Sequence, residues 1–173
     1  MEKYIKFANR GKAFENTIEM MNSVYEKQGL GKIQFNPTSH KSVKNKQGEI
    51  INFYDKKSTV DFLGCLEYRT VAFDAKECSA ERWNLKTNFK RHQEEALHNF
   101  RRGGAASFIL LHMKKYNEVY MVPLLEVQKF IAEGLKSVSI KDLRTNRLLY
   151  VSRGDQLPDY WKVIKRFAGQ NVL

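Results

Sequence analysis

The clearest alternation of apolar and polar positions lies within residues 59–76, where it predicts two adjacent β-strands. In the second strand the apolar side chains face one way, so that Asp74 and Lys76, two residues apart, share the other face. A turn within residues 64–69 would fold the first strand back along the second. This hairpin is expected to place Asp61 beside Asp74 and Lys76.

Helical periodicity predicts four helices. Apolar side chains recur every three or four positions in residues 13–27, in about residues 84–100 and in residues 158–167. A further helix is expected to begin at Pro123, because proline suits the first turn, and to run to about Ala132, where Gly134 stops it. The chain therefore contains enough amphipathic helices to cover a β-sheet.

Two polar residues lie beside or within the apolar stripes of these helices. Glu15 borders the stripe in the first turn of the first helix, where its carboxylate could lean into a site. Gln93 interrupts the apolar side of the second helix, where an amide needs a hydrogen-bond partner. That partner is either a backbone group, which is the commoner case, or the water and phosphate of a metal site.

Further apolar runs predict strands. Residues 105–113 read as a buried strand, with shorter strands at residues 119–122 and 32–35. The order helix, strand, strand, strand, helix, strand, strand, helix predicts an α/β fold with a central mixed β-sheet flanked by helices. An apolar content of 42% can fill one core, and no repeat, linker or domain boundary is visible. We therefore expect a single domain over residues 1–173.

A polar, basic segment at about residues 39–57 separates the first strand from the predicted hairpin. Its apolar middle, residues 50–54, alternates weakly, like an exposed hairpin arm with a turn at Gln47 and Gly48. The segment directly precedes Asp61, so both a solvated loop and a DNA-contacting arm fit it. Its basic residues include Lys41, Lys44, Lys46, Lys56 and Lys57.

The charge balance favours a polyanionic partner. Thirty Lys and Arg residues against nineteen Asp and Glu residues leave a net charge of +11. Such an excess indicates nucleic acid or an anionic membrane surface. No apolar run approaches the length of a membrane span, and the N-terminus lacks the apolar core of a signal peptide. Two cysteines are too few for a disulfide framework, so we expect a cytoplasmic, nucleic-acid-binding protein with no membrane contact.

Two converging carboxylates are suited to a hard divalent cation such as Mg²⁺. A neighbouring lysine can orient water or offset charge that develops on phosphorus. Asp61, Asp74 and Lys76 would then form a site for phosphodiester hydrolysis, in which the metal lowers the pKa of water. An ordinary amphipathic hairpin with a solvated Asp/Lys face fits the same spacing. No GxxxxGK[ST] or GxGxxG motif is present, so nucleotide hydrolysis and dinucleotide redox chemistry have no support.

With these residues in place, the chain resembles the RecU family of Holliday junction resolvases, which have the restriction-endonuclease-like fold. The resemblance covers roughly residues 10–123, and its pieces follow the order of the family. They are Arg10-Gly11-x-x-Phe14-Glu15, Pro37-Thr38, Thr59-Val60-Asp61-Phe62-x-Gly64, Phe73-Asp74-Ala75-Lys76-Glu77, His92-Gln93, Gly103-Gly104-Ala105 and Val119-Tyr120-Met121-Val122-Pro123. One departure is Asp74, where the family pattern is expected to have glutamate, one methylene longer.

The resemblance implies a homodimeric endonuclease, dependent on Mg²⁺ or Mn²⁺, that nicks two strands symmetrically at four-way DNA junctions. It makes Asp61 and Asp74 metal carboxylates, with Glu15 as the helix-borne acidic residue that completes the site. Lys76 becomes the lysine of the signature, and Gln93 a helix glutamine near the site.

The resemblance also gives the basic segment at about residues 39–57 a role, as a stalk that enters the centre of the junction. Arg10 and Lys12 would join the lysines of this segment in contacting DNA. A two-fold dimer supplies two sites for the paired cuts. Recognition through phosphates makes affinity depend steeply on salt. A recombinase or a branch-migration protein is a further possible partner.

Two rival interpretations remain open. One is a nuclease of the same fold that cuts duplex DNA, and comparing a junction with a linear duplex would separate the two. The other is a non-catalytic DNA-binding protein that assists recombination. The joint presence of Glu15, Asp61, Asp74 and Lys76 argues against this second interpretation.

Overall fold

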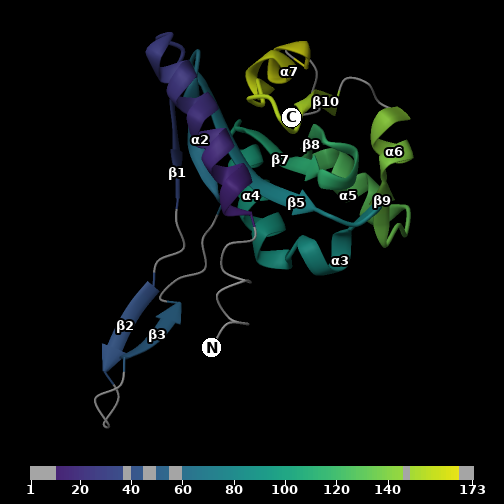
Figure 1. The fold of residues 1–173 in the computed structure, drawn as a ribbon, viewed down its shortest axis with the longest axis horizontal. Coiled ribbons are helices and arrows are strands. Elements are labelled where there is room, and N and C mark those ends of the chain that lie inside the picture. Colours follow the sequence, from purple (N-terminus) through teal and green to yellow (C-terminus); the bar gives the residue numbers. More distant parts are fainter. Residues whose placement is uncertain (1–10, 37–39, 45–49, 55–59, 146–148, 168–173) are drawn as a thin grey trace.

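A six-stranded β-sheet lies at the centre of the protein (Figure 1). The computed structural model describes residues 11–36, 40–44, 50–54, 60–145 and 149–167. The sheet has the order β1-β4-β5-β7-β8-β10. Its strands are β1 (Gly31–Phe35), β4 (Phe62–Leu66), β5 (Arg69–Cys78), β7 (Ala106–Met113), β8 (Glu118–Pro123) and β10 (Tyr150–Arg153).

The sheet is mixed, because β5 and β7 run parallel whereas every other neighbouring pair runs antiparallel. The parallel pair requires a crossover, which contains β6 (Arg82–Asn84), α3 (Leu85–Asn88) and α4 (Arg91–Arg102). The expected fold, a mixed sheet flanked by helices, is confirmed, and it is consistent with a restriction-endonuclease-like architecture.

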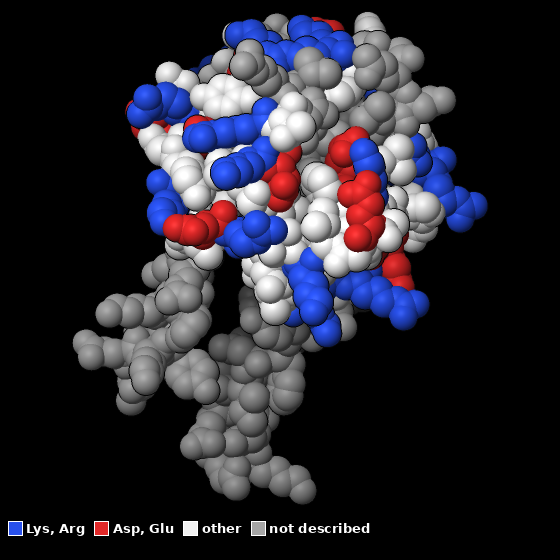
Figure 2. Space-filling view, turned by 90° about the vertical axis from the view of Figure 1, so that its right-hand side faces the viewer, with Lys and Arg blue, Asp and Glu red and all other residues white. Residues whose placement is uncertain are grey.

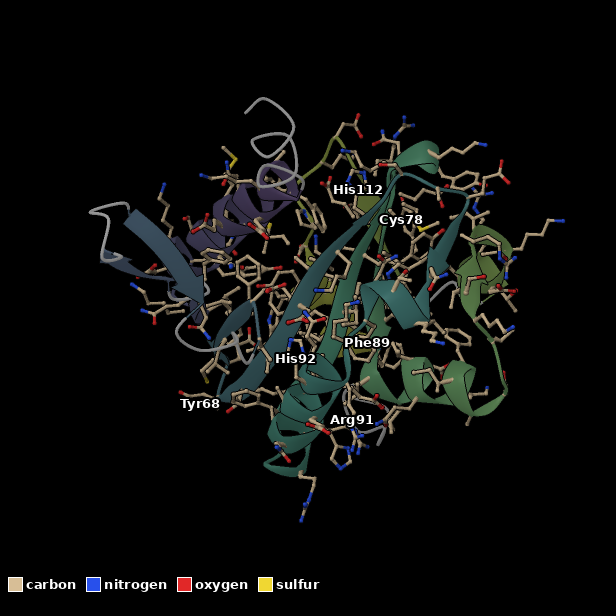
Figure 3. All side chains as sticks on the ribbon, turned by 90° about the horizontal axis from the view of Figure 1, so that it is seen from below. Tyr68, Cys78, Phe89, Arg91, His92 and His112 are labelled. Atoms are coloured by element: carbon tan, nitrogen blue, oxygen red, sulfur yellow. The ribbon has the colours of Figure 1, made fainter. Side chains whose placement is uncertain are left out.

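Helices cover both faces of the sheet. Figure 3 shows α2 (Lys12–Lys27) on one side and α4 and α5 (Leu124–Ala132) on the other. α7 (Tyr160–Arg166) lies on the α2 side, where the hydroxyl of Tyr25 in α2 accepts a hydrogen bond from the Trp161 backbone N–H at 3.0 Å. Two shorter helices, η1 (Lys114–Tyr116) and α6 (Ile140–Thr145), lie in connections. Among the described residues, none of the helices has the length and apolar composition needed to span a membrane.

An aromatic stack forms the core between the sheet and the helices α2 and α7. The rings of Phe62, Phe73 and Phe108, on three adjacent strands, are stacked with centroid distances of 4.9 and 4.8 Å. Tyr160 of α7 packs against Phe73 at 5.0 Å. Because Phe73 faces this core, alternation along β5 turns Asp74 to the other face of the sheet, as expected.

The predicted hairpin is formed by β4 and β5, with Phe62 opposite Phe73 in the register. Its turn contains only Glu67 and Tyr68, both with positive φ angles of 43° and 67°. It is therefore the tight two-residue turn that matches the twist of antiparallel strands. The register places residue 61, one position before β4, next to residue 74.

A separate two-stranded ribbon lies within the basic segment. It consists of β2 (His40–Lys44) and β3 (Ile50–Tyr54), which pair antiparallel with His40 opposite Tyr54. Figure 1 shows the ribbon apart from the central sheet, beyond the end of β1. The lysines expected there are only partly described: Lys41 and Lys44 lie on β2, whereas Lys46, Lys56, Lys57 and the proposed turn fall outside the described residues, as does Arg10.

The prediction of one helix over residues 84–100 is wrong in its first part. The chain forms two helices, α3 and α4, with extended residues between them. Asn84 accepts a hydrogen bond from the Thr87 N–H and thereby caps α3. Phe89 then adopts an extended conformation and is buried. Lys90 is also extended, and α4 begins after it. Local capping and the burial of one phenylalanine thus override a continuous helical pattern.

Strand β6 and helix α6 were not expected from the sequence. β6 pairs antiparallel with β9 (Ser137–Ser139), with Trp83 opposite Val138. The partner strand lies 55 residues further along the chain. Such a pairing leaves no local pattern in a segment of three residues.

Candidate active site

The hairpin brings Asp61, Asp74 and Lys76 together. The Asp61 backbone N–H donates a hydrogen bond to Asp74 Oδ1 at 3.0 Å, and the Ala75 N–H donates to Asp61 Oδ2 at 3.0 Å. Lys76 Nζ lies 3.3 Å from Asp74 Oδ2 and 3.7 Å from Asp61 Oδ2. Both carboxylates are therefore fixed by backbone donors and share one ammonium group.

The two carboxylates differ in burial. The Asp74 side chain is only 1% exposed, whereas that of Asp61 is 23% exposed. Burial, and after it repulsion by Asp74, raise the pKa of Asp61 to about 6, against the opposing effects of Lys76 and the Ala75 N–H. Two anions held this close are destabilised by each other, and a bound cation would relieve that repulsion.

Glu15 joins this group from α2. Burial raises the pKa of Glu15, and the charge of Lys76 lowers it, so the glutamate lies within electrostatic reach of the lysine. Glu15 also contributes to the repulsion felt by Asp61. Glu15 lies in the first turn of α2, and its N–H donates to the carbonyl of the N-cap residue Gly11 at 3.0 Å.

Glu15, Asp61 and Lys76 line one open cleft of about 930 Å³ at the end of the sheet. The buried carboxylate of Asp74 lies directly behind it, bonded to Asp61. Three other charged residues also line the cleft: Glu77, Arg82 and Lys114. Glu15, Asp61 and Lys76, all predicted from the sequence, thus meet at one concave surface, with Asp74 beside them.

Gln93, which was also predicted as a site residue, lies away from the lining of this cleft. It lies in the first turn of α4, and its Oε1 accepts a hydrogen bond from the Lys90 N–H at 3.2 Å. This bond helps to start the helix after the break at Phe89. Gln93 is not among the described residues that line the cleft.

The donor set suits Mg²⁺ or Mn²⁺, because carboxylate oxygens are the ligands that hard cations prefer. In the described part of the chain, however, no group of three or more His, Cys, Asp or Glu side chains is arranged to hold a metal ion. The Lys76 ammonium group lies against both Asp61 and Asp74. Its positive charge partly offsets the repulsion between the two carboxylates.

A second ionic group, beside the first, was not predicted. Glu77 Oε1 lies 3.4 Å from both His112 Nδ1 and Lys114 Nζ. Burial lowers the pKa of His112, which also packs against the ring of Phe14 at a centroid distance of 5.2 Å. Glu77 lies opposite His112 in the parallel register of β5 and β7. The four scattered histidines of the sequence gave no sign of this pairing.

Asp61→Asn is expected to stabilise the protein at pH 7 in the absence of divalent cations. The raised pKa means that the charged form of Asp61 is less stable in the folded protein than in the unfolded chain. Removing this charge should therefore increase the free energy of unfolding by about 2 kcal/mol, which raises the melting temperature by about 4–8 °C. The folded chain holds this proton more tightly than the unfolded chain does. Wild-type stability should therefore rise as the pH falls from about 6 towards 3.8, and the advantage of the variant should shrink.

Thermal unfolding at pH 7 and at pH 5, with a chelator present, measures this difference. Glu133→Gln, at an exposed position after α5, is the matched control and should melt like the wild type at both pH values. A melting temperature of Asp61→Asn at or below that of the wild type at pH 7 would show that the carboxylate pair is not destabilised.

Comparison with known proteins gives one consistent answer. The family model described as Recombination protein U matches residues 9–166. A Holliday junction resolvase RecU of Streptococcus agalactiae is 33% identical over 153 residues, which cover 84% of this chain and 77% of the relative. Those of Lactococcus lactis and Streptococcus sanguinis are each 31% identical, covering 82% and 94% of this chain and 70% and 85% of the relatives. The chain belongs to the RecU family.

Proposed function

We propose that this protein is a metal-dependent endonuclease that resolves four-way DNA junctions by paired phosphodiester cleavage during recombination. The observation that carries this proposal is the meeting of Glu15, Asp61, Asp74 and Lys76 at one open cleft in a RecU-family chain. The relatives are named for Holliday junction resolution. A cytoplasmic location in a bacterial cell fits these relatives and a DNA substrate.

Asp61 and Asp74, with Glu15, are proposed to hold Mg²⁺, for which Mn²⁺ can substitute. When bound, the ion supplies Lewis acidity and lowers the pKa of water. Lys76 is proposed to offset negative charge on the reacting phosphate. Gln93 is proposed to orient water or phosphate through its amide while it caps α4.

The ribbon of β2 and β3 is proposed to be the stalk that enters the junction. Contacts to the DNA backbone are assigned to Arg10, Lys12, Lys41, Lys44, Lys46, Lys56 and Lys57. Figure 2 shows one face of the body, on which Lys and Arg side chains are interspersed with Asp and Glu side chains. A basic stalk would concentrate part of the net charge of +11 where strands of the junction meet.

A homodimer is proposed because one chain carries one cleft, whereas symmetrical resolution needs two cuts. A two-fold axis would relate two copies of the Asp61 and Asp74 site as it relates the strands of like polarity in the junction. A recombinase or a branch-migration protein could deliver the junction to such a dimer.

Cleavage of a labelled four-way junction, compared with that of a linear duplex of equal arm length, tests the substrate. With Mg²⁺ present, the wild type should cut the junction at paired positions and leave the duplex largely intact. Equal cutting of both substrates would favour a general duplex nuclease of the same fold. Binding without cutting in Mg²⁺ or Mn²⁺ would favour a recombination accessory protein.

Replacing Lys41, Lys44 and Lys46 together with alanine is expected to weaken junction binding and to flatten its salt dependence. Each lost phosphate contact should reduce the slope of log affinity against log salt by about 0.9. Binding is measured by gel mobility at several KCl concentrations in a chelator. A matched control replaces Lys129, Lys162 and Lys165, which lie on α5 and α7 away from the ribbon in Figure 1. If the two triple variants had the same slope of log affinity against log salt, the ribbon would not contact the DNA.

A further inference from the structure

Three cations of the described residues line the cleft, and each is held differently. Lys76 is 17% exposed and lies within 3.7 Å of two carboxylates. Arg82 donates from Nε to Ser137 Oγ at 2.8 Å and from Nη2 to the Ser137 carbonyl at 2.9 Å. Lys114 is 47% exposed, and its ion pair is with Glu77. The Arg82 side chain is slightly more exposed, at 52%, but its guanidinium is bonded to Ser137, so Lys114 is the cation of the three with the most freedom to reach a phosphate.

The Glu77 carboxylate, which pairs with Lys114, is held in a fixed position. Glu77 and His112 are both mostly buried, and the histidine ring packs against Phe14 on one side. On another side it approaches Gly154 so closely that a β-carbon there would lie 2.1 Å from His112 Nε2. The ring has little room to move, so the Glu77 carboxylate beside it is fixed in place. An ammonium group tethered to that carboxylate reaches the cleft with little loss of conformational freedom on binding.

The charge balance of the cleft changes sign when a divalent cation binds. Its described carboxylates are Glu15, Asp61, Glu77 and, behind them, Asp74, against the three cations named above. This leaves one negative charge in excess, which repels a phosphodiester. One divalent cation would make the excess positive, so the cleft would attract a phosphate, to which Lys114 can donate beside its ion pair with Glu77.

We propose that Lys114 is a phosphate-binding residue for the DNA backbone next to the bond that is cut, and that Glu77 and His112 are positioning residues for it. This inference rests on the proposed function, because it assumes that the cleft receives DNA. Lys76 would serve the reacting phosphate, and Lys114 a phosphate flanking it on the same strand. Glu77 thereby acts on DNA through Lys114, without touching the reacting atoms.

The chain contains a matched control for this proposal. Lys114 and Lys115 are adjacent in η1, their side chains are 47% and 49% exposed, and each pairs with one glutamate, Glu77 or Glu81. Only Lys114 lines the cleft. Lys114→Ala and Lys115→Ala thus remove the same charge at the same exposure from neighbouring positions.

Junction affinity over a range of KCl, with Ca²⁺ in place of Mg²⁺, and the KM and kcat of cleavage in Mg²⁺ are the readouts. Lys114→Ala should reduce the salt slope by about 0.9 and weaken binding at low salt about 3–10-fold. It should raise KM with little change in kcat, since a flanking contact is equal in the ground state and the transition state. Lys114→Arg should restore binding, and Lys115→Ala should resemble the wild type.

Equal slopes and KM values for Lys114→Ala and Lys115→Ala, in a wild type that cuts junctions, would overturn this inference alone. A wild type that cuts no DNA would overturn the proposed function itself. The positioning role has its own test in a double-mutant cycle: the effects of Glu77→Gln and Lys114→Ala on junction binding should be non-additive, because the carboxylate acts on DNA through the ammonium group. Additive effects of the two substitutions would contradict it.

Discussion

Asp74→Asn is expected to lower Mg²⁺-dependent cleavage of a four-way junction by at least about 10³-fold, because a metal supplies several kcal/mol of transition-state stabilisation. Asp74 is almost completely buried and receives the Asp61 N–H, so asparagine can keep this hydrogen bond and the shape of the site. What the variant loses is the negative charge. Asp61→Asn should have the same effect for the same reason.

Junction binding should survive in both variants, since phosphate contacts supply most of the affinity. Cleavage is measured on a labelled junction, and binding by gel mobility on the same DNA. Asp155→Asn, which removes an exposed carboxylate far along the chain, is the control and should cut at the wild-type rate. Cleavage by Asp74→Asn within tenfold of the wild type would remove this carboxylate from the metal site.

Lys76→Met is expected to lower kcat by about 10²–10³-fold, the usual loss when one preorganised donor is removed from a transition state. Methionine keeps an unbranched apolar stem of similar length but carries no charge. The Lys76 ammonium lies against both aspartates, 3.3 Å from the nearer oxygen, so it is already close to where the phosphate would be held. The KM for junction DNA should change little.

A single-turnover rate at saturating protein isolates this chemical step. Lys90→Met, at an exposed lysine between α3 and α4, is the control. If Lys76→Met lost binding while retaining the single-turnover rate, Lys76 would be a DNA-binding residue and not a catalytic one. Lys76→Arg should rescue little, because the larger guanidinium does not fit a side chain that is 17% exposed between two carboxylates.

The meeting of Asp61, Asp74 and Lys76 could be predicted from the sequence because all three residues belong to one hairpin. Strict alternation placed Asp74 and Lys76 on one face, and a short connection to a second strand placed Asp61 beside them. The observed register and the hydrogen bond between Asp61 and Asp74 follow from that pattern. Glu15 was harder to place, since only its position beside an apolar stripe indicated that it could turn towards the cleft.

Features that depend on distant pairing could not be predicted. Strand β6 exists because it pairs with β9, and Glu77 meets His112 because β5 and β7 are parallel neighbours in one register. Neither register leaves a local trace in the sequence. The break at Phe89 has a different cause: its ring is buried more favourably outside a helix, and Gln93 then starts α4 through Lys90.

Position 74 holds aspartate where glutamate is expected for this family, and the position of the Asp74 carboxylate in the structure agrees with its shorter side chain. A side chain shorter by one methylene reaches less far into the cleft, and Asp74 is indeed bonded to the Asp61 backbone and turned away from solvent. Asp61 and Glu15 line the cleft and are better placed to meet an incoming ion first.

Binding of Mn²⁺, followed by the electron paramagnetic resonance signal of the free ion, tests the central claim most directly, because it needs neither DNA nor turnover. At neutral pH the wild type should remove Mn²⁺ from solution, competitively with Mg²⁺, and Asp61→Asn and Asp74→Asn should bind it at least about tenfold more weakly. Asp155→Asn should bind like the wild type. If both aspartate variants bound Mn²⁺ as tightly as the wild type does, Asp61 and Asp74 would not be the metal site.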